Sequence, residues 1–163
     1  MRTTPEGISK LAGLEKLELN AYQDAAGVWT IGYGCTYVDG RPVRKGDNIH
    51  DAMIAKYLLM QCLKQYENCV NKVITADITN IQFDACVMLC YNIGIGSAHS
   101  GFTGSSVVRL INQEASLEEI HPHWLDWNKI HVKGVEEICN GLVYRRNSEW
   151  AVYSDGNYHY TKP

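Results

Sequence analysis

The stretch EKLELNAYQDAAGVWTIGYGC, residues 15–35, decides how the rest of the chain is interpreted. It begins with a glutamate at the end of a helical pattern, passes through an alternating segment to an aspartate, and ends in a glycine-interrupted strand pattern. Its candidate catalytic side chains are those of Glu15, Asp24 and Thr30. Because glycoside hydrolysis uses a pair of carboxylates, these residues form the first candidate site.

The segment before this stretch predicts a helix that ends near Glu15. Thr4 and Pro5 suit the N-cap and the first helical position. Glu15 falls on the same helix face as the recurring apolar residues, which are Ile8, Leu11 and Ala12. A carboxylic acid on that face is partly desolvated, a suitable setting for a general acid. The alternative interpretation is a surface glutamate in an ion pair at the helix end.

The segment after Glu15 has a β pattern. Residues 17–46 predict a short antiparallel sheet, with turns at 24–27 and 39–42. Thr30 shares a strand face with Gly32 and Gly34, and glycines in a strand often mark the close approach of a ligand. We therefore expect a groove beside Thr30.

The remainder of the chain predicts helices. A long helix is expected from about residue 51 to 71. A capping box at 79–82 opens the strongest helical pattern of the chain, a core helix stopped by Gly94 and Gly96.

Three more helices are expected nearer the C-terminus, the first a short one through Val107, Val108 and Ile111. A second capping box at 116–119 opens a helix that Pro122 should interrupt within two turns. Asn140 is expected to cap the last helix, which should end before Gly156.

The composition is that of an ordinary globular chain. It has 163 residues and a net charge of −3, which argues against nucleic-acid binding because phosphate recognition needs clustered lysine and arginine. The N-terminus lacks the apolar segment of a signal peptide, and no apolar run reaches the roughly 18 residues of a membrane span. The sequence thus predicts no export signal and no membrane insertion.

The six cysteines are expected to be reduced thiols. Cys62 and Cys69 lie seven positions apart in a helical pattern, about 10 Å in rise, which is too far for a disulfide. Cys86 and Cys90 share a helix face, where free cysteine behaves as a small buried hydrophobe. No Cys-x-x-Cys pair suggests a zinc site. Synthesis in a reducing cytoplasm is the favoured interpretation.

The spacing of the candidate residues resembles the catalytic signature of phage-type lysozymes, the muramidase endolysins of glycoside hydrolase family 24. The signature is Glu15, eight residues, Asp24, five residues, Thr30 and then Ile-Gly-Tyr-Gly. The resemblance continues in Gln-Phe-Asp-Ala at 82–85, Tyr-Asn-Ile-Gly at 91–94 and Gly-Leu-Val-Tyr-Arg-Arg at 141–146. It covers about residues 6–153, nearly the whole chain.

The resemblance implies a fold of the α+β class, mostly helical and lysozyme-like, as a single lysozyme domain over residues 1–163. A small antiparallel β lobe would occupy about residues 15–48. A helical lobe would occupy about residues 70–155 together with the N-terminal helix. A helix at about residues 51–71 would join the two lobes, and the active-site cleft would lie between them.

The resemblance also implies hydrolysis of the β-1,4 bond between N-acetylmuramic acid and N-acetylglucosamine in bacterial peptidoglycan, without a metal or cofactor. Carried over by position, Glu15 is the general acid that protonates the glycosidic oxygen. Asp24 stabilises the oxocarbenium-like transition state or helps to place the water, and Thr30 helps to orient that water. The resemblance favours inversion, in which a water fits between the two carboxyl groups.

Further residues are candidates for supporting roles. Tyr33, Tyr91 and Asn92 are expected to contact substrate, although a core tyrosine and a helix C-terminal asparagine are equally good interpretations of Tyr91 and Asn92. Arg146, or its neighbour Arg145, is expected to form a buried ion pair in the helical lobe, with Glu15 or the helix ends as other partners.

The chain departs from the family pattern at two positions. Cys35 stands where relatives usually have a histidine that supports the catalytic glutamate, so the support of Glu15 is in doubt. Cys35 could keep a weaker hydrogen bond or be a redox-sensitive position, but an inert packed thiol is the commoner case. Lys16 stands where relatives often have glycine, and we expect it to face solvent.

Two other patterns favour structural roles. His121 and His123 could form a metal pair, but no third ligand is near in sequence, so a helix break is favoured. Three tryptophans could stack on sugars but are more often core residues at helical spacing, namely Trp124, Trp127 and Trp150.

Two rival functions remain open from the sequence. A peptidoglycan-binding protein without useful turnover would explain Cys35, but it gives no reason to keep Glu15, Asp24 and Thr30. A lytic transglycosylase uses one glutamate and closes a 1,6-anhydro ring, so it needs no water-handling residues. The resemblance suggests host lysis by a monomer made in the bacterial cytoplasm, which reaches the periplasmic or cell-wall peptidoglycan through a separate holin.

Overall fold

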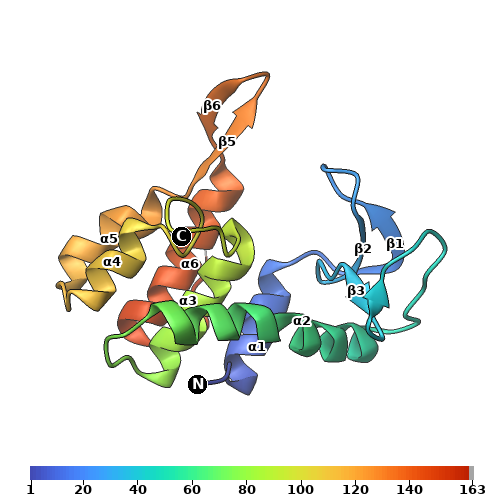
Figure 1. Cartoon of the computed structure of the whole chain (residues 1–163), viewed down its shortest axis with the longest axis horizontal. Helices are drawn as coiled ribbons and strands as arrows, with labels where there is room; N and C mark the ends of the chain where they lie inside the picture. Colours follow the sequence, from blue (N-terminus) through green and yellow to red (C-terminus); the bar gives the residue numbers. More distant parts are fainter. Residues whose placement is uncertain (162–163) are drawn as a thin grey trace. The chain divides into compact units, whose positions relative to one another are not determined.

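The computed structural model describes residues 1–161 (Figure 1). The helices are α1 Pro5–Leu14, α2 Ala52–Val73, α3 Asn80–Ile93, α4 Ser106–Asn112, α5 Leu117–Leu125 and α6 Asn140–Asp155. The strands are β1 Glu18–Gln23, β2 Trp29–Gly32, β3 Tyr37–Val38, β4 Arg41–Pro42, β5 Lys129–Val132 and β6 Val135–Ile138. The expectation of a mostly helical α+β chain is confirmed.

The chain forms two compact units, which we call the β unit and the helical unit. The β unit comprises Ile8–Gln65, and the helical unit comprises Met1–Gly7 with Tyr66–Pro163. Residues of α1 and α2 are therefore divided between the two units.

The β unit contains two separate antiparallel strand pairs, β1–β2 and β3–β4, where the sequence predicted one short sheet. The pairs surround a small core of seven buried residues, which are Ile31, Cys35, Val38, Val43, Ile49, Ala55 and Leu58. The first half of α2 contributes the last two of these, because Ala55 and Leu58 lie on its apolar face. This packing holds the β1–β2 hairpin against α2.

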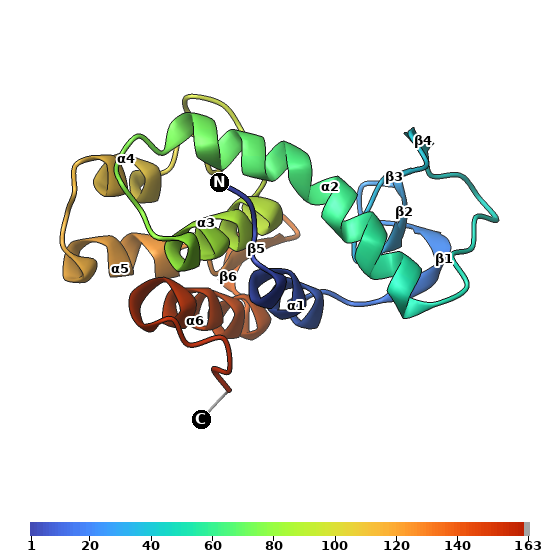
Figure 2. The same cartoon turned by 90° about the horizontal axis from the view of Figure 1, so that it is seen from below.

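The helical unit is built around α3, which is buried from Phe83 to Cys90 and packs along α6 (Figure 2). A helix that is apolar on nearly all sides belongs in a core, so the predicted core helix is confirmed. The predicted capping box is also present, since the Thr79 side chain accepts from the N–H of Gln82 and the Gln82 side chain accepts from that of Thr79. The thiols of Cys86 and Cys90 are free and buried, as expected, and burial raises their pKa.

The carboxylate of Asp84 forms hydrogen bonds with residues of the helical unit that are far apart in sequence. Asp84 is fully buried on α3 and accepts hydrogen bonds from Thr4 N (2.9 Å), Thr4 Oγ1 (2.5 Å) and Tyr158 Oη (2.6 Å). A Cβ atom on Gly7 would lie 2.5 Å from this carboxyl group, so only glycine fits there.

Two predictions about the C-terminal helices are wrong. Pro122 lies inside α5 and does not end it, because buried Ile120 and Trp124 anchor the helix on both sides of the proline. Asn140 is the first residue of α6 and not its cap. The N-cap is Cys139, whose side chain makes no capping hydrogen bond. The predicted end is confirmed, with Gly156 in the left-handed conformation.

The hairpin β5–β6 was not predicted from the sequence, and it projects from the helices of its unit (Figure 1). All eight strand residues are exposed, so no buried face gave a periodic signal. Lys133 and Gly134 form its two-residue turn, both with positive φ (49° and 80°), as turns in tight hairpins require.

Candidate active site

Glu15 follows α1 directly and continues its hydrogen-bonding pattern. Its backbone N–H donates to Leu11 O at 3.2 Å, which places the side chain on the face of the buried residues Ile8 and Leu11, as predicted. The side chain is half-buried, and its Oε1 atom is shielded from solvent. The neighbouring Lys16 is exposed and pairs with Glu18, so the expectation that it faces solvent is confirmed.

Asp24 closes the turn between β1 and β2. Its Oδ1 atom accepts hydrogen bonds from the backbone N–H groups of Ala26 (2.9 Å) and Val28 (2.8 Å). Its own N–H donates to Val28 O at 3.0 Å, and its carbonyl accepts from Gly27 N at 2.9 Å. Because Oδ1 is engaged in the turn, Oδ2 is the carboxylate atom available to a ligand. None of residues 1–161 is seen to donate a hydrogen bond to Oδ2.

Thr30 lies on β2 opposite Tyr22 of β1 and is only 3% exposed. Its hydroxyl donates to Val28 O at 2.9 Å. With the hydrogen committed to that carbonyl, the oxygen of Thr30 can act only as an acceptor, for example from a water molecule. The carbonyl of Val28 therefore links Asp24 and Thr30.

Three carboxylates of the β unit affect the phenol of Tyr22. Burial raises its pKa, and the nearby charges of Glu18, Asp24 and Glu15 raise it further. Glu15, Asp24 and Thr30, the three residues predicted to carry the chemistry, all lie in the β unit.

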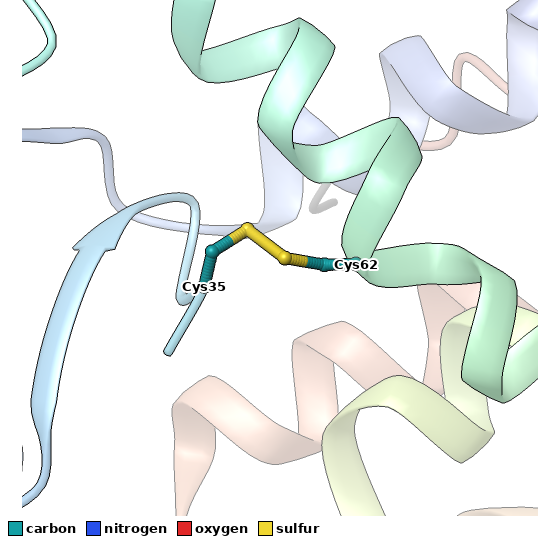
Figure 3. Close-up of a disulfide and its surroundings, with 2 residues drawn as sticks. All are labelled: Cys35 and Cys62. Atoms are coloured by element: carbon teal, nitrogen blue, oxygen red, sulfur yellow. A yellow bond between two sulfur atoms is a disulfide. The ribbon is translucent and has the colours of Figure 1, made fainter. Parts of the chain in front are cut away.

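Cys35 is not a free thiol: it forms a disulfide with Cys62 of α2 (Figure 3). The expectation of six reduced cysteines, and of an inert packed thiol at position 35, is therefore wrong. The two Cα atoms are 6.1 Å apart, within the usual range for a disulfide, although the residues are 27 positions apart in sequence. Sequence spacing excluded only pairs within one helix. Tyr33 is half-buried and packs against the same core cluster.

The other supporting residues lie in the helical unit. The ring of Tyr91 contacts that of Tyr66, with centroids 4.8 Å apart. Asn92 is exposed, and its Oδ1 accepts a 2.5 Å hydrogen bond from Nη2 of Arg146. Neither position is shown to touch substrate, so both contacts stay predictions.

The predicted buried ion pair involves both arginines. Glu149 is fully buried and accepts hydrogen bonds from Arg145 Nε and Arg146 Nη2, each at 3.0 Å. The indole N–H of Trp124 also donates to it at 3.3 Å. Trp124 is therefore a core residue, as favoured from the sequence. His121 packs flat on Trp150 with centroids 4.7 Å apart. Within residues 1–161, no group of three or more metal-ligating side chains is found.

The family of the chain follows from its similarity to known proteins. Residues 12–149 match the Phage lysozyme family. The chain belongs to the phage lysozyme family. The resemblance in the sequence motifs, the lysozyme-like fold and the expectation of a lysozyme enzyme are thereby confirmed.

Relatives of this lysozyme include an endolysin of Acyrthosiphon pisum secondary endosymbiont phage 1. It is 30% identical over 153 residues, which cover 94% of this chain and 98% of the relative. Some relatives are longer: the chain spans only 55% of an endolysin of Bacillus phage B103, to which it is 28% identical.

Comparison with solved structures supports the same family assignment. The lysozyme resembles an endolysin from Escherichia coli O157:H7 phage FAHEc1, with 36% identity and a TM-score of 0.85 over 97% of this chain and 96% of that one. It also resembles the muramidase domain of SpmX from Asticaccaulis excentricus, with 30% identity and a TM-score of 0.84 over 94% and 97%. Among residues 1–161 of the lysozyme, no helix is both long enough and apolar enough to cross a membrane.

Proposed function

We propose that this lysozyme is an endolysin that hydrolyses the β-1,4 bond between N-acetylmuramic acid and N-acetylglucosamine in bacterial peptidoglycan. The family assignment supports the substrate class. The single observation that carries the mechanism is in the β unit, where the carbonyl of Val28 accepts hydrogen bonds from both Asp24 N and Thr30 Oγ1.

Each residue has a distinct task in this proposal. Glu15 is the general acid, which protonates the glycosidic oxygen as the bond breaks. The free Oδ2 atom of Asp24 faces the positive charge that develops at the anomeric carbon or accepts a proton from the attacking water. Thr30 accepts a hydrogen bond from that water. Attack by a water held between the two carboxyl groups inverts the anomeric configuration.

The supporting residues act through binding and position. Tyr33, Tyr91 and Asn92 contact the glycan, and Arg146 holds the Asn92 amide in one orientation through the 2.5 Å hydrogen bond. The Cys35–Cys62 disulfide holds the loop after β2 on α2, at the position where relatives usually have a histidine. The enzyme works without a metal or cofactor, as a monomer.

The proposed role is host lysis, with release to the wall through lesions made by a separate holin. Expression of the lysozyme in Escherichia coli should leave the culture intact until a holin is co-expressed or chloroform is added. Lysis without either treatment would contradict the dependence on a holin.

Mass analysis of the products of purified peptidoglycan tests the reaction itself. Wild type should release muropeptides with reducing N-acetylmuramic acid ends, and Glu15→Gln should release essentially none. Anhydro products would make the chain a transglycosylase instead. A folded wild type that binds walls but releases no products would make it a binding protein.

A further inference from the structure

The first half of α2 has an apolar surface that is exposed to solvent. Four large apolar side chains are exposed there, namely Met53, Ile54, Tyr57 and Met60, and Met53 is 80% exposed. Single exposed apolar residues are common on proteins, but these four lie within about two turns of one helix. All of them belong to the part of α2 that lies in the β unit (Figure 1). We call these four residues the α2 face.

The spacing of the α2 face places its side chains along one side of the helix. Met53, Tyr57 and Met60 recur at i, i+4 and i+7, which makes a continuous stripe. Ala55 and Leu58 point to the other side of α2, where they are buried in the core of the β unit. The α2 face is therefore directed away from that core, and the fold of the β unit does not use it.

The charges beside the α2 face are all positive. Lys56 and Lys64 are exposed, and α2 contains no Asp or Glu between Ala52 and Gln65. Nζ of Lys56 donates to Oγ of Ser9 at 2.9 Å, and Nζ of Lys64 donates to Oε1 of Gln61 at 2.7 Å. Within residues 1–161 neither lysine is seen in an ion pair, so both positive charges are available to an anionic partner.

The charges of the chain are also divided unevenly between the two units. The β unit contains seven Lys and Arg residues and six Asp and Glu residues, which gives it a net charge of +1. The remainder of the chain contains eight basic and twelve acidic residues, a net charge of −4. An anionic surface therefore attracts the β unit in preference to the helical unit.

We propose that the α2 face binds the surface of an anionic phospholipid bilayer. Met53 and Met60 enter the boundary between headgroups and acyl chains, as in amphipathic helices that lie in the plane of a membrane. The ring of Tyr57 suits the headgroup level, because it is apolar with a polar hydroxyl at its end. Lys56 and Lys64 attract the anionic headgroups. Binding of this kind is peripheral and needs no membrane-spanning segment.

A bilayer fits the α2 face better than a second copy of the chain does. In a symmetric dimer packed through this face, each copy would present the same lysines and, between Ala52 and Gln65, no carboxylate. The like charges would oppose the contact. An anionic polymer without apolar groups would leave Met53 and Met60 in water. Only a surface that is both anionic and apolar beneath its charges satisfies both kinds of side chain.

Sedimentation with lipid vesicles tests the proposal. Wild type should bind vesicles of phosphatidylethanolamine and phosphatidylglycerol about tenfold or more strongly than vesicles of phosphatidylcholine at low salt. The variant Lys56→Gln, Lys64→Gln should lower the partition coefficient for the anionic vesicles about 30-fold. The variant Met53→Gln, Met60→Gln should lower it about tenfold. All four side chains are exposed, so thermal melting should show that both variants are folded.

The matched control is the pair Tyr37→Ser and Tyr57→Ser. The two tyrosines are equally exposed, at 58% and 59%, and both belong to the β unit. Tyr37 lies on β3 next to Val38, which is buried in the same core as Leu58. Because successive strand residues point to opposite sides, Tyr37 points away from the core that α2 covers. Tyr57→Ser should weaken binding to the anionic vesicles, and Tyr37→Ser should leave it unchanged.

Three results would overturn the proposal. They are a folded wild type that does not bind anionic vesicles, equal binding to the two kinds of vesicle, and equal effects of the Tyr37 and Tyr57 substitutions. Sedimentation equilibrium without lipid tests the second copy as the partner. A dimer that Met53→Gln, Met60→Gln dissociates would assign the α2 face to self-association instead. None of these measurements uses hydrolysis, so their outcome does not depend on the proposed function.

Discussion

Asp24 and Val28 are joined by two hydrogen bonds that run in opposite directions across the β1–β2 turn. The N–H of Asp24 donates to Val28 O at 3.0 Å, and the N–H of Val28 donates to Oδ1 of Asp24 at 2.8 Å. The turn therefore fixes the orientation of the carboxylate. The two carboxylate oxygens therefore have different roles. Oδ1 accepts the hydrogen bonds of the turn, and Oδ2 is available for the proposed reaction.

This separation predicts different outcomes for two substitutions of Asp24. Asp24→Asn keeps an oxygen to accept both N–H groups but loses the charge, so stability should change little while hydrolysis falls about 100-fold. Asp24→Ala also removes Oδ1, the acceptor of both side-chain hydrogen bonds of the turn, and should cost about 1–2 kcal/mol of stability as well. Urea unfolding and reducing-end release measure the two effects. Equal loss of stability in both variants would show that the turn does not depend on Oδ1.

Reduction of the Cys35–Cys62 disulfide should destabilise the lysozyme. The crosslink joins residues 27 positions apart, and a loop of that length contributes about 3.5 kcal/mol through the restricted unfolded chain. A thiol reductant should therefore lower the melting temperature of wild type. Cys62→Ser should melt lower from the start and respond no further to the reductant. A wild type whose melting temperature ignores the reductant would contradict this account.

The stability of the lysozyme should fall at low pH because Asp47 becomes protonated. The bidentate hydrogen bonds from Arg41, at 2.8 and 2.9 Å, and the N–H of Arg44 lower the pKa of Asp47 to about 2. Since the unfolded value is about 3.9, the contribution is complete above that pH and is lost as the pH falls toward 2. Unfolding of wild type and Asp47→Asn between pH 5 and 2 checks this. The difference in stability between them should shrink as the pH falls, and a constant difference would count against it.

Glu149→Gln should be strongly destabilising. It removes the charge that Arg145 and Arg146 share in the core, and loss of one partner of a buried ion pair costs about 3–5 kcal/mol. Glu18→Gln, which alters an exposed ion pair with Lys16, is the control and should have a far smaller effect. Denaturant unfolding measures both, and similar losses in the two variants would refute the prediction.

Local signals in the sequence predicted much of the helical structure because the interactions behind them join residues only a few positions apart. The capping box at Ser116 and Glu119 closes within four residues, so it can be identified without knowing the rest of the fold. The same local signals gave wrong predictions where contacts between residues distant in sequence determine the structure. Pro122 stays helical because Trp124 is buried, and that burial depends on α6.

The site was predictable in part for the same reason. Glu15, Asp24 and Thr30 lie within 16 positions of one another, and the resemblance of this whole stretch to the family's catalytic signature indicated a shared site there. The Cys35–Cys62 disulfide was missed because it joins a loop to a helix across the fold. The β5–β6 hairpin was also missed, although Lys133-Gly134 was a usable turn signal.

The buried carboxylate of Asp84 has a consequence for how this lysozyme is made. Its partners are Thr4 and Tyr158, which lie 80 and 74 positions away on either side of it in sequence. Thr4 must therefore wait until Tyr158 has left the ribosome before this carboxylate gains all of its hydrogen bonds. A chain that stops before Tyr158 cannot produce a finished helical unit.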